Sequence, residues 1–593
     1  MKRPPIPFAK TFKTFLPLKQ YFIQNRWPLA LGLVSLLVVD FLQLLIPLVI
    51  KRAIDLLTTD AANGHSLFQL GGIILVIALV IVFLRYVWRL LIFGHSRRVE
   101  EGLRNRLYEH LQTLSPSFYH RTKTGDIMAR SINDINAIRM GAGMGLVALI
   151  DGTVLGMAAI GFMLSINVKL TLISLIPAPI VIVFSRVLTR RISLGFEAVQ
   201  KTFSDLTERV REGFSGIRVI KAYCRESWEY EMVKEEGKKY ISDNMALAKD
   251  LALFFPMMAI FTNLGLAIVL CFGGRLTILG NITMGDFVAF TGYLNLLTWP
   301  MMAMGWVTSL MQRASASMGR VNRILEEVPE IKDSARPLTV PHITGAIEIK
   351  GLSIMHPGNR DYTLKDIRFR VKAGETVAVA GGVGSGKTTL LHAIPRLLDV
   401  PTETLFIDGY DVCNIPLKKL RENTGFVTQE PFIFSDTIRN NVLFGRSGVS
   451  QKDLEAVLHA AGIFEEFMAF ENGLDTMLGE RGITLSGGQR QRLTIARALI
   501  LGPSILILDD ALSMVDTRTE ERILNRVMEI RRNKTCLIVS HRVSTINRAD
   551  RIIVLERGEL LEQGKHDELM ALGGVYARLY KKQQLARELG EGR

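Results

Sequence analysis

The stretch GGVGSGKTT, residues 381–389, follows the apolar run ETVAVA and precedes a helix-prone segment. It fits the pattern G-x4-G-K-[ST] through Gly381, Gly386, Lys387 and Thr388. Glycines here let backbone N–H groups point at phosphate oxygens, the lysine neutralises the β- and γ-phosphates, and the threonine hydroxyl ligates Mg²⁺. An ordinary glycine-rich turn is the competing interpretation, and the ordered strand, loop and helix argue against it. We predict an ATP phosphate loop that also includes Gly384, Ser385 and Thr389.

A second apolar run, ILIL at 505–508, predicts a buried strand that ends at Asp509. A carboxylate at the end of such a strand directs Mg²⁺ in P-loop enzymes. Alone this is a weak signal, but together with the phosphate loop it predicts a Mg²⁺ site that includes Thr388 and Asp509. The next residue, Asp510, occupies the position expected of the base that orients the attacking water.

The chain around these motifs predicts an α/β domain at residues 345–593. Short β-branched runs such as GAIEIKGLSI, CLIVS and RIIVLERGEL alternate with helical patterns, which favours a largely parallel sheet. Immediately before this domain, three prolines interrupt the stretch EEVPEIKDSARPLTVPHITG. Residues 326–344 are therefore predicted to be a linker.

The first 325 residues have a different character and predict a membrane domain. Each of six apolar stretches is long enough to cross ~30 Å of hydrocarbon as a helix. Basic residues before the first stretch and between the second and third place the N-terminus in the cytoplasm. The polar, helix-prone stretches 95–140 and 191–247 predict that the spans continue as cytoplasmic helices. The six stretches are 28–50, 67–93, 142–165, 168–190, 248–273 and 284–311.

The overall composition agrees with a membrane protein whose soluble part lies in a reducing cytoplasm. The hydrophobic fraction is 48%, which is high for a soluble protein. The net charge of +15 could suggest nucleic acid, but basic residues beside membrane spans explain it, and we expect no nucleic-acid partner. The four cysteines are too far apart in sequence for a CxxC motif.

The stretch LSGGQRQR at 485–492 resembles the signature of ATP-binding cassette (ABC) proteins. Between the phosphate loop and the Asp509 strand, it outweighs the alternative of a capped helix start. The resemblance covers essentially the whole chain and implies a half-transporter of the type IV exporter group. It implies a nucleotide-contacting role for Ser486, Gly487, Gly488 and Gln489.

Other cassette motifs occur in the expected order, and the resemblance implies a role for each. Gln429 resembles the Q-loop glutamine, with a catalytic role and a place among the Mg²⁺ ligands. SMVD at 513–516 resembles the D-loop, whose Asp516 would contact nucleotide, and His541 resembles the switch histidine that contacts the γ-phosphate. TMLGERG at 476–482, KTGDIMARSINDI at 123–135 and GFSGIRVIKAYCRE at 213–226 resemble segments that couple the cassette to the membrane helices.

Two positions depart from the family pattern. The family has a tyrosine that stacks on adenine, and this chain has His356 there, whose imidazole offers a smaller face. The family also has a glutamate at the catalytic base, and this chain has Asp510, which is shorter by one methylene. Misplacing a base by ~1 Å can cost on the order of 100-fold in rate.

The aspartate and the intact signature together predict half of an asymmetric pair. In ABC dimers each nucleotide lies between one chain's Walker motifs and the other chain's signature. The stretches ILILDDALSMVD and FLRYVWRLLIFGHS, at 505–516 and 83–96, are similar to A-type subunits of bacterial heterodimeric multidrug-resistance-like exporters. We expect a heterodimer with a homologous half-transporter that supplies the glutamate. A slow homodimeric exporter and a mainly regulatory ATP-binding subunit are the alternatives.

The expected activity is ATP-driven export of amphipathic molecules or lipids across the cytoplasmic membrane, with the bilayer as a partner. Import is disfavoured because importers of this superfamily usually keep the cassette and the membrane domain on separate chains. Charged residues within the apolar stretches are candidates for function. Asp40 and Asp151 could meet a cationic amphiphile, or could pair with Arg85 and Arg89. The methionine-rich stretch WPMMAMGWV, 299–307, could contact varied cargo or pack the core.

Overall fold

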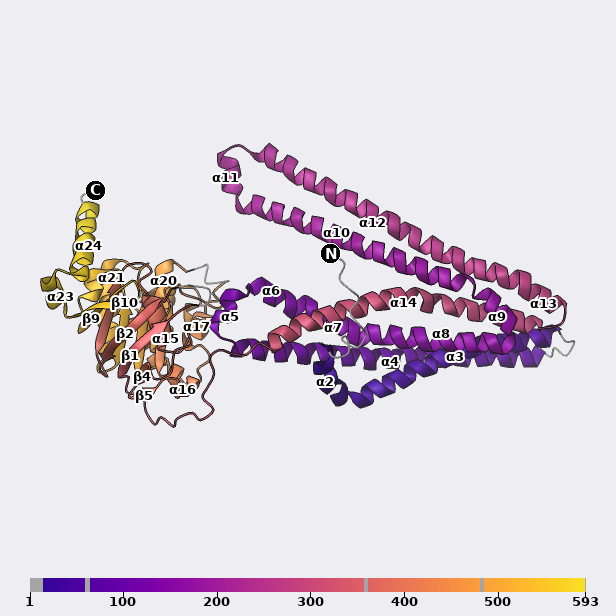
Figure 1. Ribbon diagram of the computed structural model, residues 1–593, viewed down its shortest axis with the longest axis horizontal. Coiled ribbons are helices and arrows are strands. Elements are labelled where there is room, and N and C mark those ends of the chain that lie inside the picture. The colour runs from indigo at the N-terminus through magenta and orange to yellow at the C-terminus, as the bar shows by residue number, and fades with distance from the viewer. Residues whose placement is uncertain (1–13, 59–63, 357–360, 480–484, 592–593) are drawn as a thin grey trace. The chain divides into compact units, whose positions relative to one another are not determined.

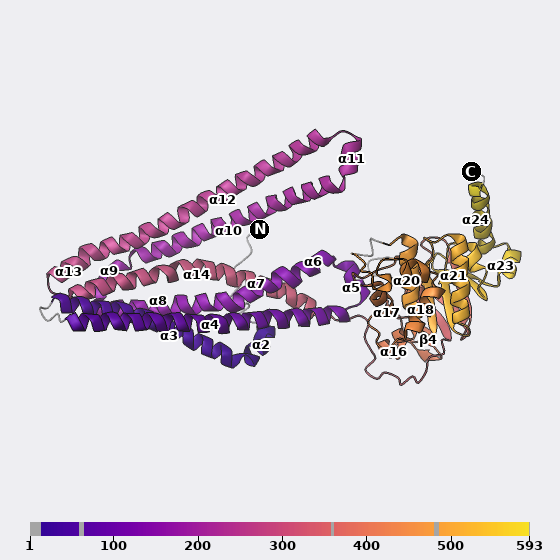
Figure 2. The same ribbon diagram turned by 180° about the vertical axis from the view of Figure 1, so that it is seen from behind.

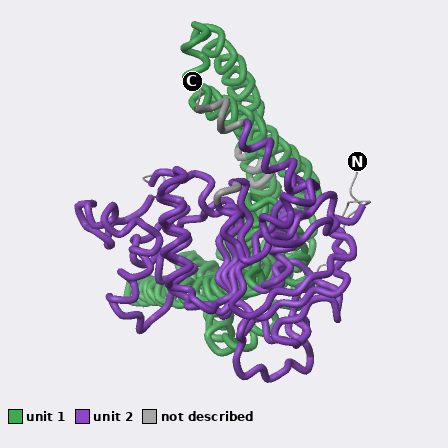
Figure 3. Tube along the Cα trace, turned by 90° about the vertical axis from the view of Figure 1, so that its left-hand side faces the viewer, with its two compact units in different colours: residues 1–112, 123–327 green, residues 113–122, 328–593 purple. Residues whose placement is uncertain are grey.

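The structure is a computed structural model that describes residues 14–58, 64–356, 361–479 and 485–591 (Figure 1). The chain divides into two compact units (Figure 3). Unit 1 comprises residues up to 112 together with 123–327, and unit 2 comprises 113–122 together with 328–593.

Unit 2 is an α/β domain built on two sheets of described residues. The larger sheet has the strand order β10-β9-β3-β8-β7-β6, in which β9 to β6 run parallel and β10 pairs antiparallel with β9. The smaller sheet is antiparallel, with the order β2-β1-β4-β5. The strands are β1 Ile347–Ile354, β2 Leu364–Val371, β3 Thr376–Gly381, β4 Leu405–Ile407, β5 Tyr410–Asp411, β6 Thr424–Val427, β7 Ile505–Asp509, β8 Thr535–Val539, β9 Arg551–Glu556 and β10 Glu559–Gly564. The prediction of a largely parallel core sheet is confirmed.

The central strands of the larger sheet are buried on both faces. In β7, Ile505 and Ile507 pack into the core between the two sheets, whereas Leu506 and Leu508 pack against helices on the opposite face. All five residues of β7 are buried, as are all five of β8. A parallel strand covered on both faces needs a continuous apolar run rather than alternation, which explains the ILIL pattern.

The helices of unit 2 are mostly short. Within the described residues they are α5 Pro116–Arg121, α15 Lys387–Ala393, α16 Leu417–Glu422, α17 Ile438–Leu443, α18 Gln451–Ala460, α19 Phe464–Met468, α20 Gly487–Leu499, α21 Thr517–Ile530, α22 Val543–Ile546, α23 His566–Leu572 and α24 Val575–Glu591, with a 3₁₀ turn at Gly473–Asp475.

Unit 1 consists of helices, and several are much longer than a membrane crossing requires (Figure 1). Its long helices are α3 Arg26–Thr58, α4 Gly64–Thr113, α8 Leu146–Ile166, α10 Pro177–Ser215, α12 Glu226–Ile268 and α14 Met284–Leu325. Its shorter helices are α2 Lys19–Gln24, α6 Thr124–Ala129, α7 Ile135–Met140, α9 Val168–Ser174, α11 Ile217–Ala222 and α13 Gly274–Ile278. A 3₁₀ turn lies at Leu16–Leu18, and π-helical turns lie at Arg130–Asp134, Gly141–Gly145 and Val269–Gly273.

Four helical stretches among the described residues are long and apolar enough to span a membrane: 26–58, 64–113, 124–166 and 168–215. They contain the first four predicted spans. The fifth and sixth predicted spans also lie in helices, α12 with the turn that follows it and α14. A shorter apolar helical stretch covers residues 263–278.

The predicted helical extensions are present. Helix α4 continues from its apolar first half to Thr113, and α10 and α12 lie side by side as a long pair joined through α11 (Figures 1 and 2). Exposed i,i+3 ion pairs line the polar part of α12, for example Lys234 with Glu231 and Lys238 with Glu235. Such pairs each stabilise a helix only slightly, but they suit a segment that leaves the bilayer.

A polar cluster fixes the segment KTGDIMARSINDI, 123–135, to α14 within unit 1. The Asp134 carboxylate is nearly buried and accepts two hydrogen bonds from the Arg320 guanidinium, one of them at 2.8 Å from Nε. The Ser317 hydroxyl donates to the same carboxylate at 2.9 Å. This two-pronged geometry is the strong form of an ion pair. By contrast, the nearby pair of Asp126 and Arg130 is on the surface, because Asp126 is 50% exposed.

We predict that Asp134→Ala destabilises unit 1 by about 2–3 kcal/mol, because it removes several hydrogen bonds to charged groups at a nearly buried site. Asp126→Ala is the matched control in the same segment, and it should cost less than about 1 kcal/mol because solvent screens its ion pair. Denaturant unfolding of the two variants in detergent micelles measures the difference. Equal losses from the two variants would contradict the prediction.

Candidate nucleotide site

The site lies where four neighbouring parallel strands end. Val379 of β3 pairs with Val539 of β8, and Val539 pairs with Asp509 of β7. Leu508 of β7 pairs with Val427 of β6. Parallel strands in register reach the same edge of the sheet together. The segments that follow them, which contain the phosphate loop, Asp510, His541 and Gln429, therefore meet in space although they are far apart in sequence.

These segments line one pocket of about 270 Å³. The pocket brings together all three residues predicted to be catalytic and all three predicted to bind the metal. Of the predicted phosphate-loop residues, Gly381 is absent from the lining because it is the last residue of β3, beneath the loop. The lining residues are Thr363, Val383, Gly384, Ser385, Gly386, Lys387, Thr388, Thr389, Gln429, Asp509, Asp510, Val539 and His541.

Two glycines of the phosphate loop are required by the backbone conformation and by close neighbouring atoms. Gly386 has φ +97°, a left-handed conformation, and a Cβ there would lie 2.7 Å from Leu364 Cδ2 and 2.9 Å from the Thr363 carbonyl oxygen. Gly381 has φ +153°, and a Cβ there would lie 2.3 Å from the Leu555 carbonyl oxygen. Only glycine fits these positions without movement of backbone.

Lys387 is buried and is held inside the loop that it closes. Its ammonium donates to the carbonyl oxygens of Gly381 at 2.9 Å and Gly382 at 2.7 Å. Burial lowers the pKa of Lys387, and the carboxylates of Asp509 and Asp510 oppose that effect. A buried cation whose partners are mainly neutral carbonyls favours the entry of an anion such as a phosphate.

Asp509 has the surroundings of a metal-directing carboxylate. Burial raises its pKa, whereas a hydrogen bond with Thr388 and the charge of Lys387 act to lower it. The carboxylate of Asp509 and the hydroxyl of Thr388 are therefore adjacent, and the amide of Gln429 lines the same pocket. These are oxygen ligands of the kind that Mg²⁺ prefers, so the residues present fit this ion.

Asp510 directly follows strand β7 in an unusual conformation. Its φ is +48°, in the left-handed region that aspartate adopts more readily than most residues. Its backbone N–H donates to the Val539 carbonyl oxygen at 2.9 Å, which extends the β7–β8 ladder by one residue. The side chain is largely buried and lines two adjoining pockets, both of which also include His541.

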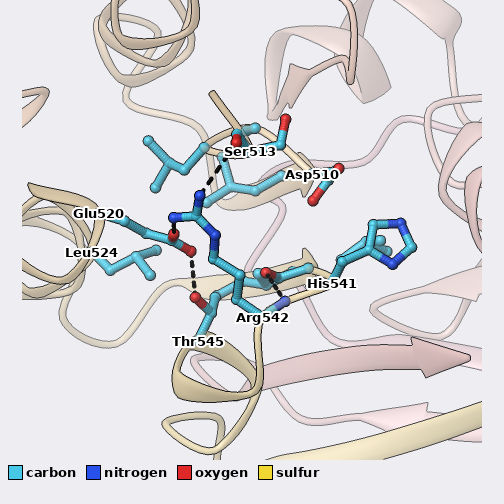
Figure 4. Close-up of a pocket in the computed structure, with 13 residues that line it drawn as sticks. Asp510, Ser513, Glu520, Leu524, His541, Arg542 and Thr545 are labelled. Atoms are coloured by element: carbon cyan, nitrogen blue, oxygen red, sulfur yellow. Dashed lines mark hydrogen bonds and ion pairs between the residues drawn. The ribbon is translucent and has the colours of Figure 1, made fainter. Parts of the chain in front are cut away.

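The second pocket, of about 260 Å³, contains a polar cluster beside His541 (Figure 4). Arg542 forms an ion pair with the buried carboxylate of Glu520 on α21, and the Thr545 hydroxyl donates to the same carboxylate. Figure 4 shows the Arg542 guanidinium pointing toward Glu520 and Ser513, while the His541 ring projects the other way. The ion pair thus anchors Arg542, the residue next to His541, and thereby fixes the position of the His541 backbone.

The signature residues are not among those lining the ATP pocket of their own chain. Ser486 caps α20 and accepts from the Gln489 N–H, and the Gln489 side chain accepts from the Ser486 N–H in return. Gln491 in the first turn after the signature holds the D-loop, accepting from the Met514 N–H at 2.9 Å and donating to the Ser513 hydroxyl at 2.9 Å.

The two signature glycines pack closely against the D-loop. A Cβ on Gly487 would lie 2.6 Å from the Met514 sulfur, and one on Gly488 would lie 3.1 Å from the Met514 carbonyl oxygen. Asp516, at the end of the D-loop, is exposed and caps α21 by accepting from the Thr519 N–H at 2.9 Å. The described contacts of Asp516 are therefore those of a helix cap.

His356 lies next to the phosphate loop but does not line the pocket. Its Nε2 is 3.4 Å from the hydroxyl of Thr389, which does line it. Its predicted stacking on adenine stays a prediction. The predicted coupling stretch 476–482 falls partly outside the described residues, because residues 480–482 are among those that the structure does not describe.

Sequence reasoning missed two features of this region. His392 on α15 is half-buried near Asp509, and burial lowers its pKa, with smaller opposing and supporting effects from Asp509 and His120. His120 belongs to α5, a short helix that groups with unit 2 and was not singled out. The Ser115–Pro116 pair marked the start of α5, because proline is favoured in the first turn of a helix.

Helix α5 is tied to the segment that leads into the nucleotide-binding domain. Arg121 donates to the Glu330 carboxylate at 3.1 Å, and the Ser117 hydroxyl donates to the same group. The Ser115 hydroxyl accepts from the Ile331 N–H at 3.1 Å. The coupling stretch predicted at 123–135 therefore begins just after α5, the helix that contacts Glu330 and Ile331.

A phosphate loop, a Walker-type carboxylate and a separate signature helix on one α/β unit, joined to a unit of long apolar helices, define an ABC transporter. Family comparisons agree: a model described as "ABC transporter transmembrane region" matches residues 29–301, and one described as "ABC transporter" matches residues 364–513. The chain belongs to the ABC transporter family, with a transmembrane region and an ATP-binding domain.

Curated relatives align over nearly the whole chain. The chain is 35% identical to the probable multidrug resistance ABC transporter ATP-binding/permease protein YheI of Bacillus subtilis, over 96% of this chain and 98% of the relative. It is also 35% identical to the multidrug resistance-like ATP-binding protein MdlA of Escherichia coli, over 98% of each chain. An ATP-dependent lipid A-core flippase of Syntrophus aciditrophicus is 33% identical over 95% of this chain and 93% of the relative.

A solved structure confirms the predicted fold class. The structure of a bacterial Atm1-family ABC exporter with ATP bound aligns with a TM-score of 0.76 over 95% of this chain and 98% of that chain. At 24% identity, this likeness speaks for the fold alone. The chain thus has the type IV exporter fold, with a helical transmembrane domain fused to a nucleotide-binding domain.

We predict that Gly386→Ala abolishes measurable ATP binding, because the added Cβ would meet Leu364 and the Thr363 carbonyl at a left-handed backbone position. Gly382→Ala is the matched control four residues earlier, since a Cβ there meets no atom within 4 Å and its φ is not positive. Binding of a fluorescent ATP analogue to the purified full-length chain measures both. Retention of wild-type affinity by Gly386→Ala would show that the loop does not hold phosphate in this conformation.

Proposed function

We propose that this chain is one half of a heterodimeric exporter that moves amphipathic molecules or lipids out across the cytoplasmic membrane. ATP drives the transport, and the ATP site built on this chain's own Walker motifs hydrolyses slowly. The observation that carries the proposal is Asp510, which lines the ATP pocket next to Asp509 in the place of the catalytic base. The names of the relatives support export of drugs or lipids as the activity.

The shorter side chain of Asp510 is what makes hydrolysis slow. A general base must come within hydrogen-bond distance of the water that it activates. The backbone of Asp510 is fixed by the hydrogen bond to Val539 and by burial, so it cannot move forward to compensate for the missing methylene. ATP binding does not depend on this base, because the phosphate loop and the Mg²⁺-directing residues are complete.

When ATP and Mg²⁺ are bound, each pocket residue has a separate task. Lys387 and the loop N–H groups hold the phosphates, while Thr388, Asp509 and Gln429 would hold Mg²⁺, which offsets phosphate charge. His541, two residues after the end of β8, lines the same pocket and would contact the γ-phosphate, and the ion pair of the neighbouring Arg542 with Glu520 holds this segment in place. The carboxylate of Asp510 then lies too far from the attacking water to accept its proton efficiently, so hydrolysis is slow.

The signature supports asymmetry between the two sites of a dimer. Ser486 is exposed at the start of α20, and the signature does not line this chain's own pocket, so it is available to a nucleotide bound on another chain. A homologous half-transporter with a glutamate at the base position would gain a complete site from this signature. A slow homodimeric exporter and a regulatory ATP-binding subunit are the alternatives that the following experiments separate.

We predict that the purified chain alone, in lipid nanodiscs, has little ATPase activity and that Asp510→Glu raises its kcat on the order of 100-fold, because glutamate restores the reach of the base. Asp510→Asn is the control, with the same length as the wild type but no basicity. ATP binding should be equal in all three proteins. The thermal unfolding midpoints of the three proteins are compared as well, because glutamate adopts a positive φ less readily than aspartate and could destabilise the fold.

Three results of that assay have distinct meanings. A silent wild type rescued by glutamate supports the slow site. Brisk hydrolysis by the wild type that is lost in Asp510→Asn makes aspartate a sufficient base and favours the homodimer. A chain that binds ATP but hydrolyses none even as Asp510→Glu favours the regulatory subunit.

We predict a second asymmetry in the assembled heterodimer. Ser486→Arg should abolish most of the ATPase activity, because it blocks the signature that completes the partner's competent site. Lys387→Ala should leave most of the activity, because it removes ATP only from the slow site. ATPase assays on complexes that carry one variant at a time measure this. Equal losses from both variants would argue for two equivalent sites. Ser486 is exposed, so arginine there costs the fold little beyond the loss of a helix cap, about 1 kcal/mol.

A further inference from the structure

Asp40 is an unusual residue in the interior of unit 1. It lies in α3, within the first apolar stretch, and only 1% of it is exposed. Neither of its carboxylate oxygens has a hydrogen-bond partner among the described residues. An ionised carboxylate in such a place is strongly disfavoured, so it calls for a proton or an opposite charge.

The ionisable groups close enough to act on Asp40 are another carboxyl, Asp151 on α8, and the guanidinium of Arg85 on α4. Two carboxyls so close together are more stable when they share one proton than when both are ionised. Arg89 is not part of this group, because its guanidinium lies over the Trp88 ring at 5.6 Å.

A third residue contacts the accessible member of the pair. The indole N–H of Trp299 on α14 donates to Asp151 Oδ2 at 3.0 Å. Because Asp151 is partly exposed while Asp40 is buried, Asp151 is the carboxyl that a ligand can reach.

Small residues allow this arrangement. Helix α14 packs against α8 where α8 has glycines, and a Cβ on Gly156 would lie 3.5 Å from the Pro300 side chain. This close packing brings the neighbouring Trp299 to Asp151. Trp299 stays 50% exposed, and Asp151 is partly exposed, so the pair presents a carboxylate and an aromatic ring on the surface of the helical bundle.

We propose that Asp151 and Trp299 form a binding site for the cationic head of a monovalent amphiphile, with the buried Asp40 as the residue that positions Asp151. The carboxylate is bonded to the N–H edge of the half-exposed indole, so charge attraction and a cation–π contact with the ring can act on the same ligand. Two carboxyls that share one proton carry a single negative charge, which matches one positive charge. This inference rests on the proposed export of amphipathic molecules and names a class of cargo for it.

The test uses the full-length chain in nanodiscs of phosphatidylcholine, without nucleotide. Tetraphenylphosphonium and tetraphenylborate are the probes, because they have nearly the same shape and opposite charge. Equilibrium dialysis measures their binding. The wild type should prefer the phosphonium, and Asp151→Asn should weaken phosphonium binding at least about tenfold, since it removes the charge at constant size.

Further variants separate a binding role from a structural one. Asp151→Glu should keep most of the phosphonium binding, because it keeps the charge. Trp299→Phe should weaken binding by a few-fold up to about tenfold, as expected for loss of the better cation–π ring and of the N–H donor. Asp243→Asn, the same change on the cytoplasmic part of α12, is the control and should bind like the wild type.

Phosphonium binding that is unchanged in Asp151→Asn, or no preference for the cation over the borate, would overturn the proposal.

The outcome is independent of the proposed function. Binding is measured without ATP, so a failure of the slow-site hypothesis leaves this result intact. An exporter that moves neutral amphiphiles but does not distinguish the two probes would overturn this site and leave the proposed export in place.

Discussion

The nucleotide site depends on one constraint, the parallel pairing of β3, β8, β7 and β6 with their carboxyl ends at one edge of the sheet. Each strand delivers one functional segment to that edge, and a one-residue change in register would turn the side chains of a strand to the opposite face. The apolar runs that bury both faces of β7 and β8 lock this register. The packing of the core therefore also sets the positions of the residues that line the nucleotide pocket.

That dependence supports the proposal that the missing methylene at Asp510 slows hydrolysis. The residue follows the last residue of β7, and its N–H continues the sheet ladder by bonding to Val539. Because the backbone that carries this base is held by the sheet, it cannot shift to correct the distance between the carboxylate and the water. The same rigidity serves His541, whose neighbour Arg542 is anchored on the buried Glu520. Elsewhere in unit 2, hydrogen bonds of Gln491 join the signature helix to the D-loop.

Much of the architecture was predictable from local patterns. The phosphate loop, the Asp509 strand, the parallel sheet and the long helical extensions follow from glycine positions, apolar runs and their lengths. The roles of Gln429 and His541 came from family resemblance, because a lone glutamine or histidine after a strand has no chemical signature. Helix α5 was missed since six residues give no periodicity, and its contacts with Glu330 join residues more than 200 positions apart.

The sequence by itself determined the class of this protein, because phosphate chemistry requires particular residues at fixed spacing and hydrocarbon requires long apolar runs. It also determined that Asp510 is one methylene short, a covalent fact. Only the tertiary structure decided which distant side chains meet. Asp40, Asp151 and Trp299 lie on three helices and more than 100 residues apart in sequence, and their contact comes from helix packing around glycine. Spacing along the chain carries no record of such contacts, since they arise from how whole helix surfaces fit together.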